Sequence, residues 1–320
     1  MSKDEYLITD APLKALTVFA MPMILGSFFQ QVYNMADSII VGQFVGSSAL
    51  AAVGACAALT NVFICVALGA GVGAGVLVSR YFGAREYGKM KTIVSTSLIS
   101  FLLLSIILGV FGFCFSHAMM SGLQTPADIL EKAVLYLRVY FVGFPFLFMY
   151  NVQASIFNSL GDSKRPLYLL IFSSLLNIAL DMVFVICFHQ GVRGVAVATL
   201  IAQGVSAVLS FFLLMRKLKG YEEEEKYGCY DFGMMRSMVK IAVPSTLQQS
   251  IVHMGILLVQ SVVNSFGSAA LAGYSAGSRI ESLSIVPMLA MGNAMSTFTA
   301  QNIGAGKKER IPLGFREGGL

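Results

Sequence analysis

The first residue with evident chemistry is an aspartate within a long apolar stretch. Asp37 follows Gln30, Tyr33 and Asn34 by seven, four and three residues, so in a helix the four side chains share one face as a polar stripe. A carboxylate at membrane depth is costly unless something compensates for it, and by default it marks a functional site. The alternative is a purely structural aspartate that hydrogen-bonds a neighbouring helix.

A second carboxylate, Asp181, lies in a later apolar run. Asn177 precedes it by four residues, one helical turn on the same face, and Thr199 and Gln203 have the same spacing in the next run. The connection between these runs, 189–193, is so short that the two helices must be adjacent and antiparallel. Asn177, Asp181 and Thr199 can therefore face a common point, although a lone threonine in a membrane helix usually bonds its own preceding carbonyl.

The surrounding sequence is that of an all-α, polytopic membrane helical bundle. Apolar residues make up 56% of the 320 residues and charged residues 12%, against about 25% charged in an ordinary soluble domain. Apolar runs of about 20 residues separated by short polar loops are typical of transmembrane helices, and alternating strand segments are missing. The runs predict eight helices, at 13–42, 50–79, 92–116, 133–158, 166–189, 193–215, 241–265 and 271–301.

The distribution of basic residues predicts the orientation. With the N-terminus inside, the cytoplasmic segments hold all but four of the 22 Lys and Arg residues. By the positive-inside rule this places both termini in the cytoplasm of a multi-pass plasma-membrane protein. The net charge of +5 therefore reflects membrane topology and not nucleic-acid binding. The exceptions are Lys132, Arg138, Arg193 and Arg279.

An internal repeat predicts two lobes. The segment 44–51 recurs loosely at 266–272, and Gly83-Ala84 recurs as Gly304-Ala305. Six helices separate the copies, so the repeat is parallel, which is typical of secondary transporters with the substrate between the halves. We expect a six-helix lobe at 1–219, a charged cytoplasmic linker at 220–240, and an incomplete second lobe at 241–320 with two helices and the approach to a third.

Other motifs favour packing over chemistry. The glycines of GAGVGAG do not follow a strand or the GxGxxG spacing of a nucleotide loop, and they form overlapping GxxxG pairs that let helices approach closely. Asn151, Ser155 and Asn158 form another polar stripe, which lines a watery path or ties helices together. The five cysteines and three histidines lack metal-ligand spacing. We predict no metal site beyond a sodium site and no cofactor.

In the order and spacing of its motifs, nearly the whole chain resembles the bacterial branch of the multidrug and toxic compound extrusion (MATE) family. The motifs are MADSIIVGQFVG (35–46), RYFGAR (80–85), SLGD (159–162), NIALD (177–181) and QNIGAG (301–306).

The resemblance implies twelve helices in two six-helix lobes and export of organic cations in exchange for Na⁺ or H⁺. It also implies a cation site in the first lobe, at the positions of Asp37, Asn177, Asp181 and Thr199. Oxygen ligands of this kind suit a hard cation, and two carboxylates in a low dielectric can instead hold a proton. We expect site occupancy to bias an inward/outward equilibrium, with a helix bend at Pro22.

The residues also lead to expectations about the substrate cavity and the partners. Small organic cations and the lipid bilayer are the expected partners, and the protein is expected to be monomeric. The family's alternative carboxylate site on helix seven is not matched here, because Gln248 and Gln249 stand on that helix. The predicted polar lining of the substrate cavity comprises Gln30, Tyr33, Asn34, Asn151, Gln203 and Gln248.

Three other functions remain open. A flippase for lipid-linked oligosaccharides would require a more cationic cleft than one lined by Asp, Asn and Gln. A membrane-embedded enzyme would need a catalytic motif such as HExxH or a nucleophile with its base, and none is present. Finally, the chain as given is expected to be shorter than two full copies of the repeat, which would make it a transport-incompetent piece.

Overall fold

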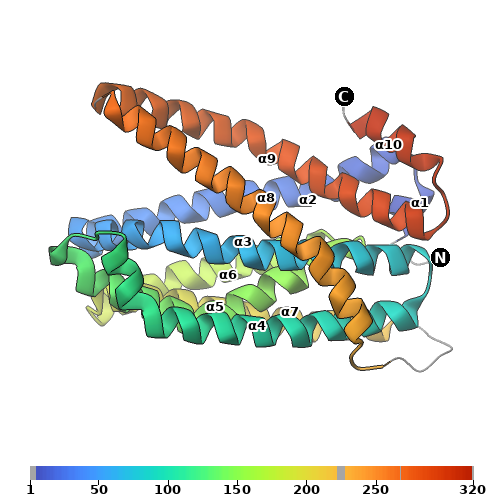
Figure 1. Ribbon diagram of the computed structural model, residues 1–320, viewed down its shortest axis with the longest axis horizontal. Coiled ribbons are helices and arrows are strands. Elements are labelled where there is room, and N and C mark those ends of the chain that lie inside the picture. Colours follow the sequence, from blue (N-terminus) through green and yellow to red (C-terminus); the bar gives the residue numbers. More distant parts are fainter. Residues whose placement is uncertain (1–4, 222–227, 267, 319–320) are drawn as a thin grey trace.

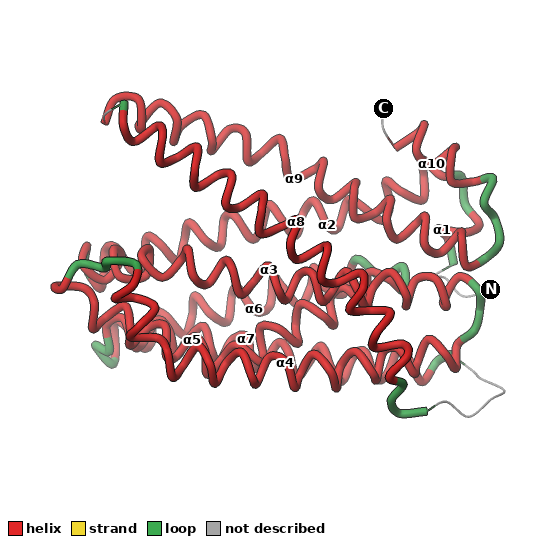
Figure 2. The backbone as a smooth tube through the Cα atoms, in the orientation of Figure 1, coloured by secondary structure: helices red, strands yellow, loops and turns green. Residues whose placement is uncertain are grey.

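The computed structural model describes residues 5–221, 228–266 and 268–318, and these are almost entirely helical (Figures 1 and 2). The eight predicted helices are confirmed as α2 to α9, with ends that differ by several residues. The elements are α1 (Tyr6–Thr9), α2 (Pro12–Ile40), η1 (Val41–Val45), α3 (Ser47–Gly83), α4 (Tyr87–Gly122), α5 (Ala127–Ser159), α6 (Lys164–Met182), η2 (Val183–Cys187), α7 (Gly191–Lys219), α8 (Phe232–Ser265), α9 (Ser268–Gly304) and α10 (Arg310–Gly318).

The predicted linker is partly helical. α8 begins at Phe232, well before the predicted start at 241, because the Asp231 carboxylate accepts a 2.7 Å hydrogen bond from the Met234 backbone N–H and so caps the helix. The four glutamates of the linker lie outside the described residues. The last stretch, predicted as the approach to a ninth helix, forms the short α10.

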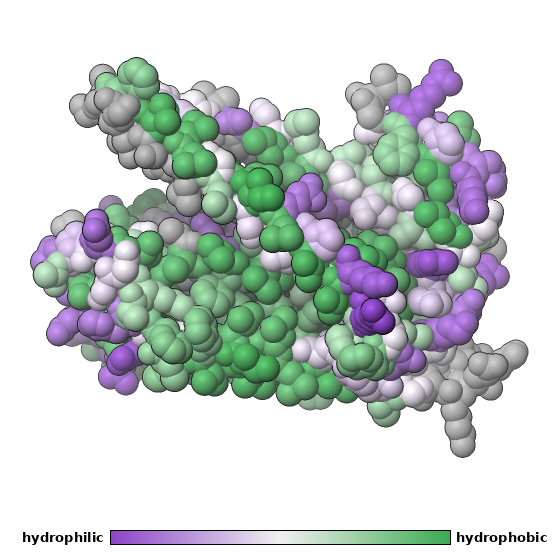
Figure 3. Space-filling view, in the orientation of Figure 1, coloured by the Kyte–Doolittle hydropathy of each residue, from purple (hydrophilic) through white to green (hydrophobic). Residues whose placement is uncertain are grey.

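The helices have the length and surface of a membrane protein. In the described part of the chain, six segments between Pro12 and Lys219 are long and apolar enough to span a bilayer. α8 and α9 are 34 and 37 residues long, which exceeds the about 20 residues that a span requires. Figure 3 shows apolar residues over the middle of the molecule and polar residues gathered toward its ends.

Small residues hold the two lobes together along α3. A Cβ on Gly73 would lie 2.7 Å from the Met238 carbonyl of α8, whereas one on Gly75 would lie 2.8 Å from the Ser155 hydroxyl of α5. The two GxxxG pairs therefore face different helices: Gly69 and Gly73 admit α8, and Gly71 and Gly75 admit α5. The predicted close packing is confirmed, and it places α3 between α5 of the first lobe and α8 of the second.

The ends of α3 and α9 make a reciprocal contact that follows the repeat. Gly83 lies against the carbonyl of Gln301, and Gly304 lies against the carbonyl of Arg80, so closely that a Cβ at either glycine would overlap the other helix. The two contacts are equivalent positions of the two copies. The lobes therefore meet at the end that carries both chain termini, and α8 and α9 diverge from α2 and α3 toward the other end (Figures 1 and 3).

Candidate cation and substrate site

The predicted polar residues line a cavity of about 490 Å³ inside the first lobe. α2, α5, α6 and α7 supply most of its wall, and α3 adds Thr60 and Asn61. The cavity is polar because each of these helices turns one short stripe of side chains inward. Its lining includes Gln30, Tyr33, Asn34, Asp37, Asn151, Asn177, Thr199 and Gln203.

The Asn177 amide connects three helices at the base of this cavity. Its nitrogen side lies 2.7 Å from the Tyr33 hydroxyl and 2.9 Å from Asp181 Oδ2, and its oxygen side lies 3.0 Å from the Thr199 backbone N–H. In this orientation the amide donates to the α2 tyrosine and to the aspartate one turn along α6, and it accepts from α7. The Thr199 hydroxyl also lies 3.0 Å from the Val195 carbonyl, the local bond expected of a membrane threonine.

Asp37 completes the group from α2. Its carboxyl group is close enough to that of Asp181 for a hydrogen bond between the two side chains. Asp181 is fully buried, and each aspartate has one buried oxygen, Oδ1, without a protein partner among the described residues. The four residues predicted to form a cation site are thus brought together, with carboxylate oxygens left over for a ligand.

Three tyrosines of the site were not singled out from the sequence. Tyr136, Tyr140 and Tyr150 of α5 line the same cavity, and the Tyr140 hydroxyl is buried without a partner in the described structure. The spacing of Tyr136 and Tyr140, one helical turn apart, was the available signal. Their rings add aromatic surface to the cavity that Asp37 also lines.

Each aspartate-bearing helix ends in a π-helical segment. η1 begins four residues after Asp37 and η2 two residues after Asp181, and each is closed by a bond from five residues on, Gly46 N to Val41 O and Phe188 N to Val183 O, both at 3.1 Å. The two segments pack together through Val41 and Val185. Such segments are frequent at functional sites.

A second cavity of about 280 Å³ lies where α3 and α5 meet α8 and α9. Asn151 lines both cavities, and Asn158 has a buried oxygen without a partner in the described structure. Ser155, the middle residue of the α5 stripe, donates a 2.6 Å hydrogen bond to the Gly71 carbonyl. The stripe therefore ties α5 to α3 through its serine and lines polar cavities through its asparagines.

Two predicted residues lie apart from this group. Gln248 is exposed and lines neither cavity, whereas its neighbour Gln249 lines the second one. Pro22 is buried within α2, which runs unbroken through it. A larger apolar cavity of about 970 Å³, between α9, α10 and the end of α3, contains none of the predicted site residues.

Comparison with known proteins identifies related sequences and structures. The MatE family description matches residues 22–183 and 244–318. The chain is 29% identical over 300 residues to the probable multidrug resistance protein YpnP of Bacillus subtilis, covering 93% of this chain and 67% of that protein. It is 26% identical over 319 residues to the FAD transporter of Shewanella oneidensis, covering 96% of this chain and 69% of that one.

The fold is also that of a solved transporter. A structure described as the outward-facing conformation of a multidrug resistance MATE family transporter superposes with a TM-score of 0.85 at 27% identity. The superposition covers 99% of this chain and 71% of the other.

Proposed function

The chain belongs to the MatE family, whose curated relatives are membrane transporters, and on that premise we propose that it exports organic cations, including drugs, in exchange for Na⁺ or H⁺ by alternating access. The observation that carries this proposal is the close pair of carboxyl groups, with the half-buried Asp37 lining the internal cavity and the fully buried Asp181 next to it. A pair of buried carboxylates in apolar helices is costly unless a cation compensates for it.

The same pair suits either coupling ion. Na⁺ prefers hard oxygen ligands, which Asp37, Asp181 and Thr199 supply. Rotation of the Asn177 amide would add its Oδ1 to this set. A proton is the other candidate, since a hydrogen bond between two carboxyl groups requires that one of them be protonated. Neutralising the pair with either ion removes the repulsion between the carboxylates. Ion binding thereby becomes coupled to helix packing.

The cavity favours a cationic substrate with aromatic character. The Asp37 carboxylate attracts positive charge, and the rings of Tyr136, Tyr140 and Tyr150 suit a cation held by an aromatic wall. One relative is named an FAD transporter, so membership of the family alone does not define the cargo, and the residues of the site are the better guide. Among the described residues that line this cavity there is no Lys or Arg, which argues against the flippase function, because an oligosaccharide diphosphate needs cationic partners.

The two lobes supply the conformational change. They meet at the end that carries the termini and diverge at the other end, and the positive-inside rule predicts that the meeting end is cytoplasmic. We propose that this is the outward-open arrangement, that the protein works as a monomer in the plasma membrane, and that Pro22 allows α2 to bend as the lobes rearrange.

The test is counterflow in proteoliposomes that contain this chain. Ethidium is trapped inside, and its release is followed under an imposed sodium gradient, a proton gradient, or neither. Release driven by one gradient and lost in Asp37→Asn supports the proposal. No response of the purified chain to either gradient contradicts it.

A binding measurement separates a protein that cannot transport from a wrong site. The chain has 12 tyrosines and no tryptophan, and four of the tyrosines line the cavity, so tyrosine emission reports on the site directly. A change in emission with Na⁺, pH or ethidium that is lost in Asp37→Asn, without transport, identifies a transport-incompetent piece with an intact site. No change with any of the three contradicts the site itself.

A further inference from the structure

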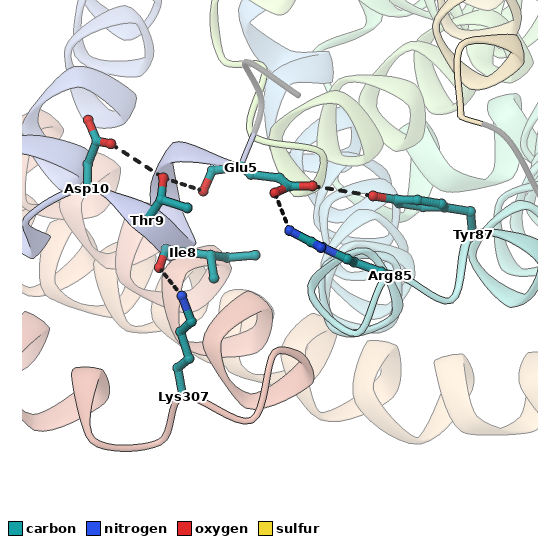
Figure 4. Close-up of polar contacts among 7 residues, drawn as sticks. All are labelled: Glu5, Ile8, Thr9, Asp10, Arg85, Tyr87 and Lys307. Carbon is teal, nitrogen blue, oxygen red and sulfur yellow. Dashed lines mark hydrogen bonds and ion pairs between the residues drawn. The ribbon is translucent and has the colours of Figure 1, made fainter. Parts of the chain in front are cut away.

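The segment Glu5–Asp10, which includes α1, lies across the junction of the two lobes at the end that carries the termini (Figure 4). We call it the strap. It is short and carries two acidic residues, yet Glu5 is buried together with Leu7 and Ile8. A free N-terminal tail would not be buried in this way, because termini are poorly ordered unless contacts hold them.

Side chains attach the strap to the first lobe. The Glu5 carboxylate lies 2.8 Å from Nη2 of Arg85, in the connection between α3 and α4, and 3.5 Å from the hydroxyl of Tyr87, the first residue of α4 (Figure 4). The Tyr6 hydroxyl donates a 2.9 Å hydrogen bond to the Gly161 carbonyl, between α5 and α6. Because Glu5 is buried, its charge depends on Arg85 for compensation.

Main-chain carbonyls attach the strap to the second lobe. α1 is a single turn, so the carbonyls near its end have no helical partners. Asn302 donates to the Leu7 carbonyl and Lys307 to the Ile8 carbonyl, both at 3.1 Å, and Arg310 donates to the Asp10 carbonyl. Leu7 also packs in one apolar cluster with Phe298 of α9.

The strap therefore bridges the reciprocal glycine contact between α3 and α9. Moving the lobes apart at this end would leave a buried carboxylate or several buried carbonyls without partners, which is unfavourable. We propose that the strap holds this end closed, and that its release from one lobe is required before the end can open. The proposal rests on the alternating-access function above, and it assigns to Glu5 and Arg310 a role in setting the equilibrium between the two arrangements.

The experiment measures the distance between the lobes. Spin labels are attached at Lys219→Cys in the first lobe and Lys308→Cys in the second, both exposed positions outside the strap, with the exposed Cys114, Cys187 and Cys229 replaced by serine. Pulsed electron–electron double resonance then gives the distribution of distances between the two labels for the full chain in lipid nanodiscs. Glu5→Gln breaks the attachment to the first lobe, and Arg310→Gln that to the second.

Each variant is expected to increase the population with long inter-lobe distances by at least about fivefold, because each removes a charge-assisted hydrogen bond. Arg85→Gln should match Glu5→Gln, and the double variant should add nothing further, because the two residues act as one pair. Lys14→Ala is the control: it removes the exposed Lys14–Asp10 pair, which does not connect the lobes, and should leave the distribution unchanged.

The strap proposal would be overturned if Glu5→Gln and Arg310→Gln both left the inter-label distance distribution unchanged and had melting temperatures like that of the wild type. Misfolding of one variant leaves the other as the test, since the two act on opposite lobes. The readout does not depend on ions or drugs. Longer inter-lobe distances in the variants without any transport would uphold the strap proposal and reject the transporter proposal. Transport with unchanged distances would reject the strap proposal and uphold the transporter proposal.

Discussion

The Tyr33 hydroxyl lies 2.7 Å from the Asn177 amide, and each of these residues is one helical turn ahead of an aspartate on its own helix. The bond therefore joins α2 to α6 beside the Asp37–Asp181 pair. It restrains the relative position of α2 and α6 beside the two carboxyl groups, and for the proposed cation site this would couple the position of α2 to ion binding.

Tyr33→Phe keeps the ring and removes this bond. We expect the concentration of coupling ion for half-maximal transport to rise about fivefold, corresponding to the roughly 1 kcal/mol of one hydrogen bond. The rate at saturating ion should change little. Tyr168→Phe, on the exposed surface, is the matched control, and an equal effect of both substitutions would show that the bond is irrelevant.

Asp181→Asn separates function from stability. It should abolish ion-driven transport, because one carboxylate remains where two are needed, while the melting temperature stays equal or rises, because a buried charge has been removed. Transport and thermal unfolding are measured on the same preparation. Asp128→Asn, in the first turn of α5 and away from the cavity, should leave transport intact. A large loss of stability in Asp181→Asn would instead indicate a purely structural aspartate.

Gly83→Ala and Gly304→Ala should each destabilise the protein by about 1–3 kcal/mol, because the added methyl group overlaps a carbonyl of the facing helix. Gly255→Ala is the control, since a Cβ there meets nothing within 4 Å. It should be neutral or stabilising by up to about 1 kcal/mol, as expected for alanine in a helix. Thermal unfolding in detergent measures both. The same response at all three positions would contradict the close approach of α3 and α9.

Lys217→Met tests a buried ion pair between α7 and the connection of α5 with α6. The Lys217 ammonium group lies 2.8 Å from Asp162 Oδ2, and the side chain is only 6% exposed. Loss of the ammonium group should destabilise the protein by about 2–3 kcal/mol. This is less than the loss of stability on breaking an isolated buried pair, because Arg165 also contacts Asp162 at 3.1 Å. Lys14→Met, at a surface pair, should change stability by less than about 1 kcal/mol.

Sequence reasoning located the helices and placed Asn177, Asp181 and Thr199 near a common point because both depend on local spacing. That Asp37 joins them in one site was implied by the family resemblance. Apolar runs reveal membrane helices, and polar residues three or four apart inside such runs reveal an inward face. The short connection between α6 and α7 then placed Asn177 and Thr199 together. That these residues bind a cation remains a prediction.

Other features depend on contacts between distant segments and leave little local signal. The strap is held by Asn302 and Arg310, which lie almost the whole chain away from it. The π segments η1, VGQFV, and η2, VFVIC, share no residue pattern that distinguishes them from α-helix. Gln248 was chosen for its residue type, but the rotation of α8 turns Gln249 to the second cavity instead.

The glycine contacts at the ends of α3 and α9 bear on how the proposed exchanger would open at this end. Gly83 presses on a carbonyl of α9 and Gly304 on a carbonyl of α3, so separating the two helices breaks both contacts at once. In the proposed exchanger, a contact with two linked halves would be lost as a unit, without an intermediate in which only one half has separated. Duplication of a single helix end thus supplies both sides of this contact between the lobes.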